Sequence, residues 1–100
     1  MIDQARMDEL RDEIGDAVEE VFEIFLAEAD GVLHQLRDAP DGPVRVELLH
    51  FLRSGALNLG FRGLAERAHA AECGDVEDWP GLLAELEVLL RGVRAELNAA

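Results

Sequence analysis

The sequence predicts an all-helical protein, an antiparallel four-helix bundle with a short extra helix at its N-terminus. Apolar residues recur at intervals of three and four along most of the chain, which is the spacing of one helix face. Glycine and proline gather at a few short breaks between these segments. Short connections between long amphipathic helices favour antiparallel neighbours. Aromatic residues make up only 5% of the chain although 49% of it is hydrophobic, a composition that suits a helical core.

The first two helices are separated by a glycine. The short helix is expected from about Asp3 to Ile14, and Gly15 ends it. Asp16 then resembles an N-cap, with Glu19 three residues later completing a capping box. The second helix is expected from about Ala17 to Asp38. The apolar stripes consist of Ile2, Met7, Leu10 and Ile14 in the first helix and of Val18, Val21, Phe22, Phe25, Ala29, Val32, Leu33 and Leu36 in the second.

A proline-rich turn precedes the third helix. The run Pro40-Asp41-Gly42-Pro43 stops the second helix. Pro43 suits the first position of the next helix, where a backbone N–H would have no intrahelical partner. This third helix is expected from Pro43 to Asn58. Gly60 is expected to end it in a left-handed conformation, which a residue with a Cβ resists.

The last two helices complete the predicted bundle. The fourth helix is expected from about Phe61 to Cys73 and is followed by a loop from Gly74 to Asp78. Asp78 is expected to cap the last helix, which carries Trp79 and Pro80 in its first turn. The expected core residues are Phe61, Leu64, Ala65, Ala68 and Ala71 in the fourth helix and Leu82, Leu83, Leu86, Leu89, Leu90, Val93 and Leu97 in the fifth.

Length and charge narrow the class of protein. Residues 1–100 are expected to form a single domain. The chain has 22 acidic residues against nine arginines and no lysine, a net charge of −13, which argues against binding to nucleic acid or anionic membranes. No run reaches the roughly 18 apolar residues of a membrane span, and the N-terminus lacks the layout of a signal peptide. We therefore expect a cytoplasmic protein. Cys73 is the only cysteine and is interpreted as structural or neutral.

One histidine of the third helix is expected to face solvent. A helix turns about 100° per residue, which places His50 opposite the apolar side of its helix. A neutral imidazole in such a position is a nucleophile that can accept a phosphoryl group. The expected apolar side consists of Leu48, Leu52, Gly55 and Leu59, and the expected neighbours of His50 are Val46, Arg53, Ser54 and Leu57.

The run from His50 to Gly60, His-Phe-Leu-Arg-Ser-Gly-Ala-Leu-Asn-Leu-Gly, resembles the signature of histidine-containing phosphotransfer (HPt) domains. That signature is His-x-Leu-(Lys/Arg), three small residues, two variable residues and Leu-Gly. HPt domains relay phosphoryl groups between response-regulator receiver domains in two-component signalling. The resemblance extends over nearly the whole chain, through Leu10, Gly15, Phe25 and Leu36 upstream and Leu64 and Glu72 downstream.

The resemblance implies a role for each residue around His50. His50 would be the phosphoacceptor, through Nε2. Arg53 stands where the family usually has lysine, and its guanidinium would stabilise the phosphoryl group. Ser54 is a small neighbour whose hydroxyl can bond a phosphoryl oxygen, although the family more often has glycine there and serine next. Asn58 is interpreted as supporting the helix end. The expected docking residues are Val46, Leu57, Gly60 and Phe61.

The implied partners are response-regulator receiver domains and a hybrid histidine kinase. The chain is expected to be a monomer with no metal or cofactor of its own, because the receiver would supply magnesium. It has no glycine-rich phosphate loop and no lysine, so we expect a phosphocarrier without ATP-dependent kinase activity.

Several alternatives compete with this hypothesis. His34 begins a similar string, His-Gln-Leu-Arg, but it lacks the small residues and shares its face with acidic residues. His69 is interpreted as structural. The run from His50 to Ser54 also faintly resembles the phosphoacceptor box of sensor kinases, with Phe51 in place of its acidic residue and Gly55 in place of its proline. The third alternative is a helical adaptor or inhibitor that is never phosphorylated.

Overall fold

The structure is a computed structural model that describes residues 2–38, 42–74 and 76–99. The prediction of an all-helical protein is confirmed, because the described residues contain no strand beyond an isolated bridge between Ile2 and Phe61. None of their helices is long and apolar enough to cross a membrane. The five helices are α1 (Gln4–Ile14), α2 (Ala17–Asp38), α3 (Pro43–Leu59), α4 (Arg62–Cys73) and α5 (Trp79–Ala99).

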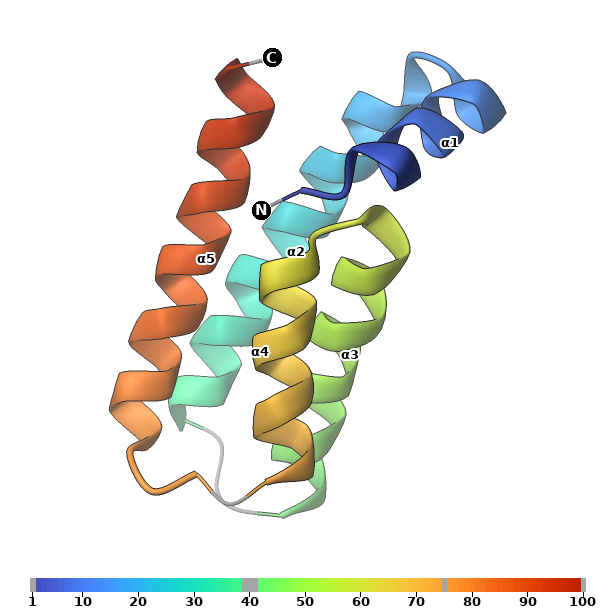
Figure 1. Cartoon of the computed structure of the whole chain (residues 1–100). Helices are drawn as coiled ribbons and strands as arrows, with labels where there is room; N and C mark the ends of the chain where they lie inside the picture. The colour runs from blue at the N-terminus through green and yellow to red at the C-terminus, as the bar shows by residue number, and fades with distance from the viewer. Residues whose placement is uncertain (1, 39–41, 75, 100) are drawn as a thin grey trace.

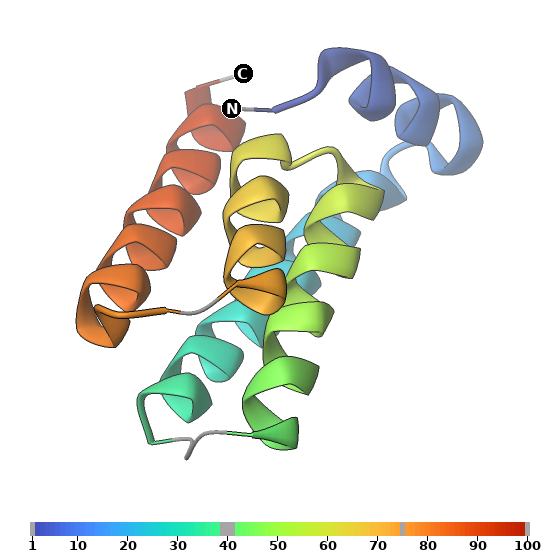
Figure 2. The ribbon, with the colours of Figure 1, turned by 60° about the horizontal axis from the view of Figure 1, so that its bottom comes forward.

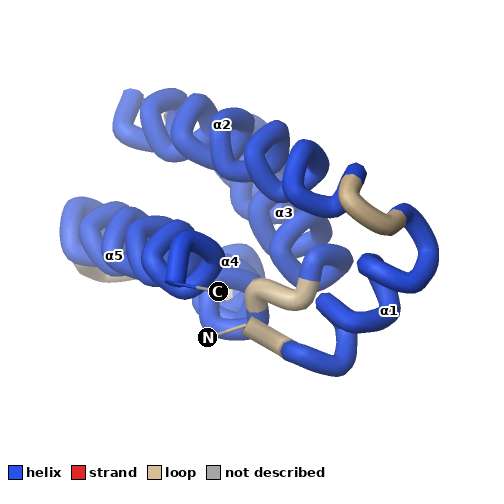
Figure 3. Tube along the Cα trace, turned by 90° about the horizontal axis from the view of Figure 1, so that it is seen from above, coloured by secondary structure: helices blue, strands red, loops and turns tan. Residues whose placement is uncertain are grey.

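The four longer helices lie side by side around one core (Figure 1). Helix α4 lies between α3 and α5 (Figure 2), and α2 contacts both α3 and α5. Helix α1 lies against α2 and α3 at one end of the molecule (Figure 3). The backbones of α2 and α4 approach each other less closely than those of these neighbouring helices, and so do the backbones of α3 and α5. The α2–α3 side and the α4–α5 side therefore lie on opposite sides of the core.

Helix α1 begins and ends as its sequence predicts. The Asp3 carboxylate accepts hydrogen bonds from the backbone N–H groups of Ala5 and Arg6, and Gly15 ends the helix at φ 61°. The predicted capping box is wrong. The backbone carbonyl of Asp16, not its side chain, accepts from the N–H of Glu19 at 3.3 Å. The Glu19 carboxylate instead lies 3.3 Å from the guanidinium of Arg11 in α1.

The apolar stripes are largely those expected, with small corrections. Ile14 is exposed, because it lies at the end of α1 where no helix covers it. Helix α2 has the predicted bounds and buries Leu26 in addition to the predicted residues, while Val21 is only partly buried. The turn predicted at Pro40 and Asp41 lies outside the described residues.

Helix α3 is rotated slightly from the predicted orientation. Leu48 and Gly55 are only partly buried, because the helix packs against both α2 and α4. The chain leaves α3 through Gly60, whose φ of 83° is left-handed as predicted, a conformation that glycine adopts without a Cβ penalty. The residues of α3 that face the core are Leu49, Leu52, Ala56 and Leu59.

The loop end of the bundle is fixed by Asp78 and Trp79. The Asp78 carboxylate accepts from the backbone N–H of Gly81 at 3.0 Å, which confirms the predicted cap of α5. The indole N–H of Trp79 donates to the Leu36 carbonyl at 3.2 Å, and the Arg45 guanidinium lies 3.7 Å above the ring centroid. Trp79 thus joins α5 to the ends of α2 and α3. Asp75, in the predicted loop, lies outside the described residues.

Candidate functional site

The side chain of His50 points into solvent from the middle of α3, with 54% of its surface exposed. Leu49 and Leu52 are almost completely buried and therefore fix the rotation of α3 against the core. Truncating either leucine to alanine typically costs about 2–5 kcal/mol. The orientation of His50 follows from this packing, as the helical wheel predicts.

A carboxylate from the neighbouring helix holds the imidazole. Glu72 of α4 accepts a hydrogen bond from Nε of Arg53 at 2.7 Å, and its other oxygen lies 2.9 Å from Nδ1 of His50. Only 15% of the Glu72 side chain is exposed. The hydrogen bond from Arg53, and after it the one from His50, lowers the pKa of Glu72 below its ordinary value of 4.5. Glu72 is therefore an anion at neutral pH.

The contacts of Nδ1 admit two tautomers of His50. A terminal nitrogen of Arg53 also lies 2.9 Å from Nδ1, but one ring nitrogen cannot donate to Glu72 and accept from Arg53 at the same time. If the proton is on Nδ1, the ring donates to Glu72 and the lone pair of Nε2 is free. If the proton is on Nε2, Nδ1 accepts from Arg53. The anionic carboxylate favours the first tautomer, which is the nucleophilic one.

The nucleophilic edge of the ring has a small polar neighbour. The hydroxyl of Ser54 lies 3.3 Å from Nε2, one turn further along α3. Together, His50, Arg53 and Ser54 present a nucleophile, a guanidinium and a hydroxyl on one face, as predicted. Sequence reasoning noted Glu72 only as a family match and missed its contact with His50. An acidic residue on the helix after Gly60 was the available signal.

An apolar groove of about 760 Å³ runs between α2 and α3 beside His50. Ile24 and Phe51 are large exposed apolar residues in its lining. The carboxylates of Glu28 and Glu47 also line it and have no ion pair among the described residues. The lining residues are Val21, Ile24, Phe25, Glu28, Glu47, His50, Phe51, Ser54, Gly55, Asn58 and Leu59.

Two of the four predicted docking residues are on the surface. Val46 and Leu57 are exposed. Phe61 is completely buried against Phe22 and Phe25, and Gly60 is buried beside Arg6 of α1. The prediction that Gly60 and Phe61 contact a partner is wrong, because the left-handed turn at Gly60 directs the chain back into the core. Ile24 and Phe51, which are not among the predicted docking residues, are exposed beside His50 in the groove between α2 and α3.

Asn58 has the predicted structural role. Its carbonyl accepts from Nε of Arg6 at 2.7 Å, and its side-chain oxygen accepts from a terminal nitrogen of Arg6 at 3.2 Å. The N–H of Asp3 donates to the carbonyl of Gly60 at 2.7 Å. These bonds attach α1 to the end of α3.

The other two histidines lack the environment of His50. His34 is exposed on α2 and has no hydrogen bond to any residue in the described ranges. His69 is exposed, with its ring 3.6 Å from the sulfur of Cys73. Within residues 2–38, 42–74 and 76–99, no three histidine, cysteine or acidic side chains are grouped to hold a metal ion.

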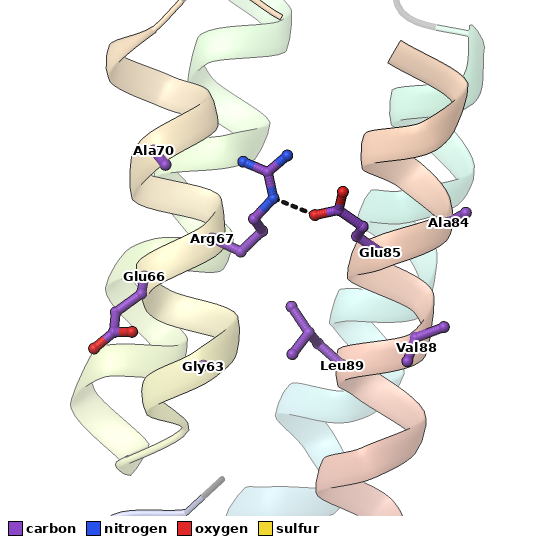
Figure 4. A pocket seen from close by; sticks show the side chains of 8 residues that line it. All are labelled: Gly63, Glu66, Arg67, Ala70, Ala84, Glu85, Val88 and Leu89. Carbon is purple, nitrogen blue, oxygen red and sulfur yellow. Dashed lines mark hydrogen bonds and ion pairs between the residues drawn. The ribbon is translucent and has the colours of Figure 1, made fainter. Parts of the chain in front are cut away.

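A second groove lies on the opposite side of the bundle, between α4 and α5, with a volume of about 670 Å³. Arg67 of α4 and Glu85 of α5 form an ion pair across it, above Leu89 (Figure 4). Its lining contains no histidine, cysteine or serine. The two grooves are similar in size, but only the α2–α3 groove has a nucleophile at its edge.

Comparison with known proteins identifies the family. The model of the Hpt domain matches residues 20–96, which include α3, α4 and every side chain around His50. No match was found among curated proteins or among solved structures. Hpt domains are phosphocarrier modules of phosphorelays rather than kinases, and they interact with receiver domains and histidine kinases. Because the match spans most of its length, the chain belongs to the Hpt domain family.

Proposed function

We propose that this chain is a monomeric phosphorelay carrier, an antiparallel four-helix bundle that accepts a phosphoryl group on His50. The group would come from the aspartyl phosphate of one receiver domain and pass to the aspartate of another. A hybrid histidine kinase would supply the first receiver. The observation that carries the proposal is the His50–Glu72 contact, which favours a lone pair on the solvent-facing Nε2.

The transfer step consumes no further reactant. The lone pair of Nε2 attacks phosphorus, the N–P bond forms, and the P–O bond to the receiver's aspartate breaks. The aspartate leaves as a carboxylate. The proton stays on Nδ1, where its hydrogen bond to Glu72 stabilises the positive charge of the ring. The reverse transfer to a second receiver follows the same path.

Arg53 and Ser54 would contact the transferred group. Nε of Arg53 is held by its hydrogen bond to Glu72. A modest rotation of the guanidinium can therefore move its terminal nitrogens away from Nδ1 of His50 and toward a phosphoryl group on Nε2. Charge-assisted bonds of this kind are about twice as strong as neutral ones. Ser54, 3.3 Å from Nε2, can donate its hydroxyl proton to a phosphoryl oxygen. Magnesium, bound by the receiver, would neutralise most of the remaining charge.

The receiver would cover the groove between α2 and α3 while it reaches His50. This groove is continuous with His50 and contains exposed apolar residues such as Ile24 and Phe51. Apolar centres with polar rims are typical of protein interfaces. Val46 and Leu57, exposed on the same helix as His50, would lie at the edge of the contact.

The proposal is tested by the intact mass of the protein after treatment with phosphoramidate. We expect one acid-labile phosphoryl group on the wild type and on His34→Gln, and none on His50→Gln. An adduct that persists in His50→Gln, or is lost in His34→Gln, would move the acceptor to another histidine. If no variant is labelled and His50→Ala binds a receiver as well as the wild type does, the chain is an adaptor that is never phosphorylated.

A further inference from the structure

A glycine of α3 near the site packs directly against an aromatic ring of α2. A Cβ atom added at Gly55 would lie 2.3 Å from Cε1 and 2.9 Å from Cδ1 of Phe25. Such distances are far shorter than the roughly 3.5–4.0 Å of carbon–carbon contact. The ring of Phe25 therefore occupies the volume that any side chain at position 55 would need.

Other aromatic rings confine Phe25. Its ring centroid lies 5.8 Å from that of Phe61, which is completely buried, and Phe22 packs behind Phe61. On the outer side it stacks on Phe51, with centroids 6.2 Å apart and planes at 25°. Since Phe61 and Phe22 lie on its inner side, a Phe25 ring displaced by a side chain at position 55 has its open path toward Phe51 and the groove.

We propose that Gly55 is a positioning residue, which seats Phe25 and, through it, Phe51, and thereby shapes the groove that receives the receiver domain. The proposal relies on the proposed function for the identity of the partner. In this proposal, the small residue at position 55 matters because it leaves space for Phe25 on the inner side of α3. A side chain there would disturb docking by displacing Phe25, not by blocking the approach of the partner to His50.

Other helical glycines provide matched controls. Alanine at Gly31 of α2 or Gly92 of α5 would meet no atom within 4 Å, so its higher helix propensity should stabilise the protein. The same propensity favours alanine at Gly55. A loss of stability in Gly55→Ala alone would therefore report the clash with Phe25.

The test is a double-variant cycle of Gly55→Ala and Phe25→Leu, with Gly31→Ala as the control. Transfer from a phosphorylated receiver is measured against carrier concentration, beside labelling by phosphoramidate. We expect Gly55→Ala to raise the half-saturating concentration about tenfold, the effect of losing one well-packed interface side chain. Labelling by phosphoramidate, which needs no docking, should stay at the wild-type level. Because leucine lacks the ring atoms, Phe25→Leu should restore most of the docking in the double variant.

Several results would overturn the proposal. Docking by Gly55→Ala that equals the wild type would show that position 55 does not shape the groove. A docking defect that Phe25→Leu does not relieve would show that the side chain at 55 faces the partner directly. If Gly55→Ala does not fold, the double variant is compared with Phe25→Leu alone; equal docking supports the proposal and weaker docking contradicts it. Failure of the proposed function itself would look different, since wild type would then also transfer nothing.

Discussion

Helix α4 shares an arginine–glutamate ion pair with each of its two neighbours. Toward α3, Arg53 pairs with Glu72; toward α5, Arg67 pairs with Glu85. The first carboxylate is 15% exposed and contacts a histidine, whereas the second is 55% exposed and contacts none. Ion pairs between exposed side chains typically contribute about 0–1 kcal/mol. An arginine–glutamate pair by itself is thus an ordinary feature of helix packing. The pair between α3 and α4 differs because its carboxylate also contacts His50.

Replacing the carboxylate of each ion pair by glutamine should give the largest difference in transfer rate between the two pairs. Glu72→Gln removes the anion that favours the proton on Nδ1, and we expect transfer to His50 to slow by roughly tenfold to a hundredfold, less than for a buried carboxylate–histidine pair because this site is open to water. Glu85→Gln should transfer like the wild type. Single-turnover transfer from a phosphorylated receiver measures both variants. Equal rates in Glu72→Gln and wild type would remove Glu72 from the mechanism.

Replacing the arginine of each ion pair by glutamine should give a smaller difference in transfer rate. Arg53→Gln loses the charge beside the transferred group but leaves Glu72 next to His50, so we expect about a fivefold to tenfold slower transfer, consistent with one charge-assisted hydrogen bond. Arg67→Gln is the control. The lifetime of phosphohistidine in each variant, followed by mass, shows whether Arg53 also stabilises the product. A slowing that is the same in both variants would indicate a general effect on packing.

Charge reversal should distinguish the two grooves. Glu28 and Glu47 line the α2–α3 groove, whose lining contains no arginine. We expect a receiver that docks there to present basic residues, so Glu28→Lys/Glu47→Lys should slow association about threefold to tenfold at low salt, and less at high salt. Glu66 and Glu77, exposed beside Arg67 on the other side, give the control double reversal. Faster association of the groove variant would indicate an acidic partner surface.

The smallest expected effect is on stability at low pH. The folded-state pKa of Glu72 is below its ordinary value of 4.5, so its contribution to folding is fully present above that value. The contribution is lost as the pH falls through the folded-state pKa. The difference in unfolding free energy between wild type and Glu72→Gln should shrink as the pH falls below 4.5. Urea unfolding at several pH values below 4.5 measures it, and a difference that grows over that range would contradict the lowered pKa.

Local features were predictable and contacts between helices were not. The helix ends follow from Asp3, Gly15, Gly60 and Asp78, each of which acts on backbone groups a few residues away. The exposure of His50 follows from the periodicity of α3. Such signals are contained in short stretches of sequence, which is why the predicted helices match the structure closely.

Glu72 and Phe61 show what a linear pattern does not contain. The contact between Glu72 and His50 depends on how α4 packs on α3, which no periodicity within either helix specifies. Phe61 directly follows Gly60, and the helical wheel predicts that it lies near the site. The left-handed turn at Gly60 instead reverses the chain and buries Phe61. The helical wheel places Gly55 on the apolar side of its helix, but it does not specify that Phe25, thirty residues earlier, is the ring that Gly55 contacts.

The bond between Asp3 and Gly60 has a consequence for the order of folding during synthesis. Its N–H donor and its acceptor carbonyl are separated in the sequence by α1, α2 and α3. Translation adds about 5–20 residues per second, so Met7 and Leu10, which α1 buries in the finished protein, are made several seconds before the carbonyl of Gly60. Helix α1 therefore reaches its final place only after α3 has been made.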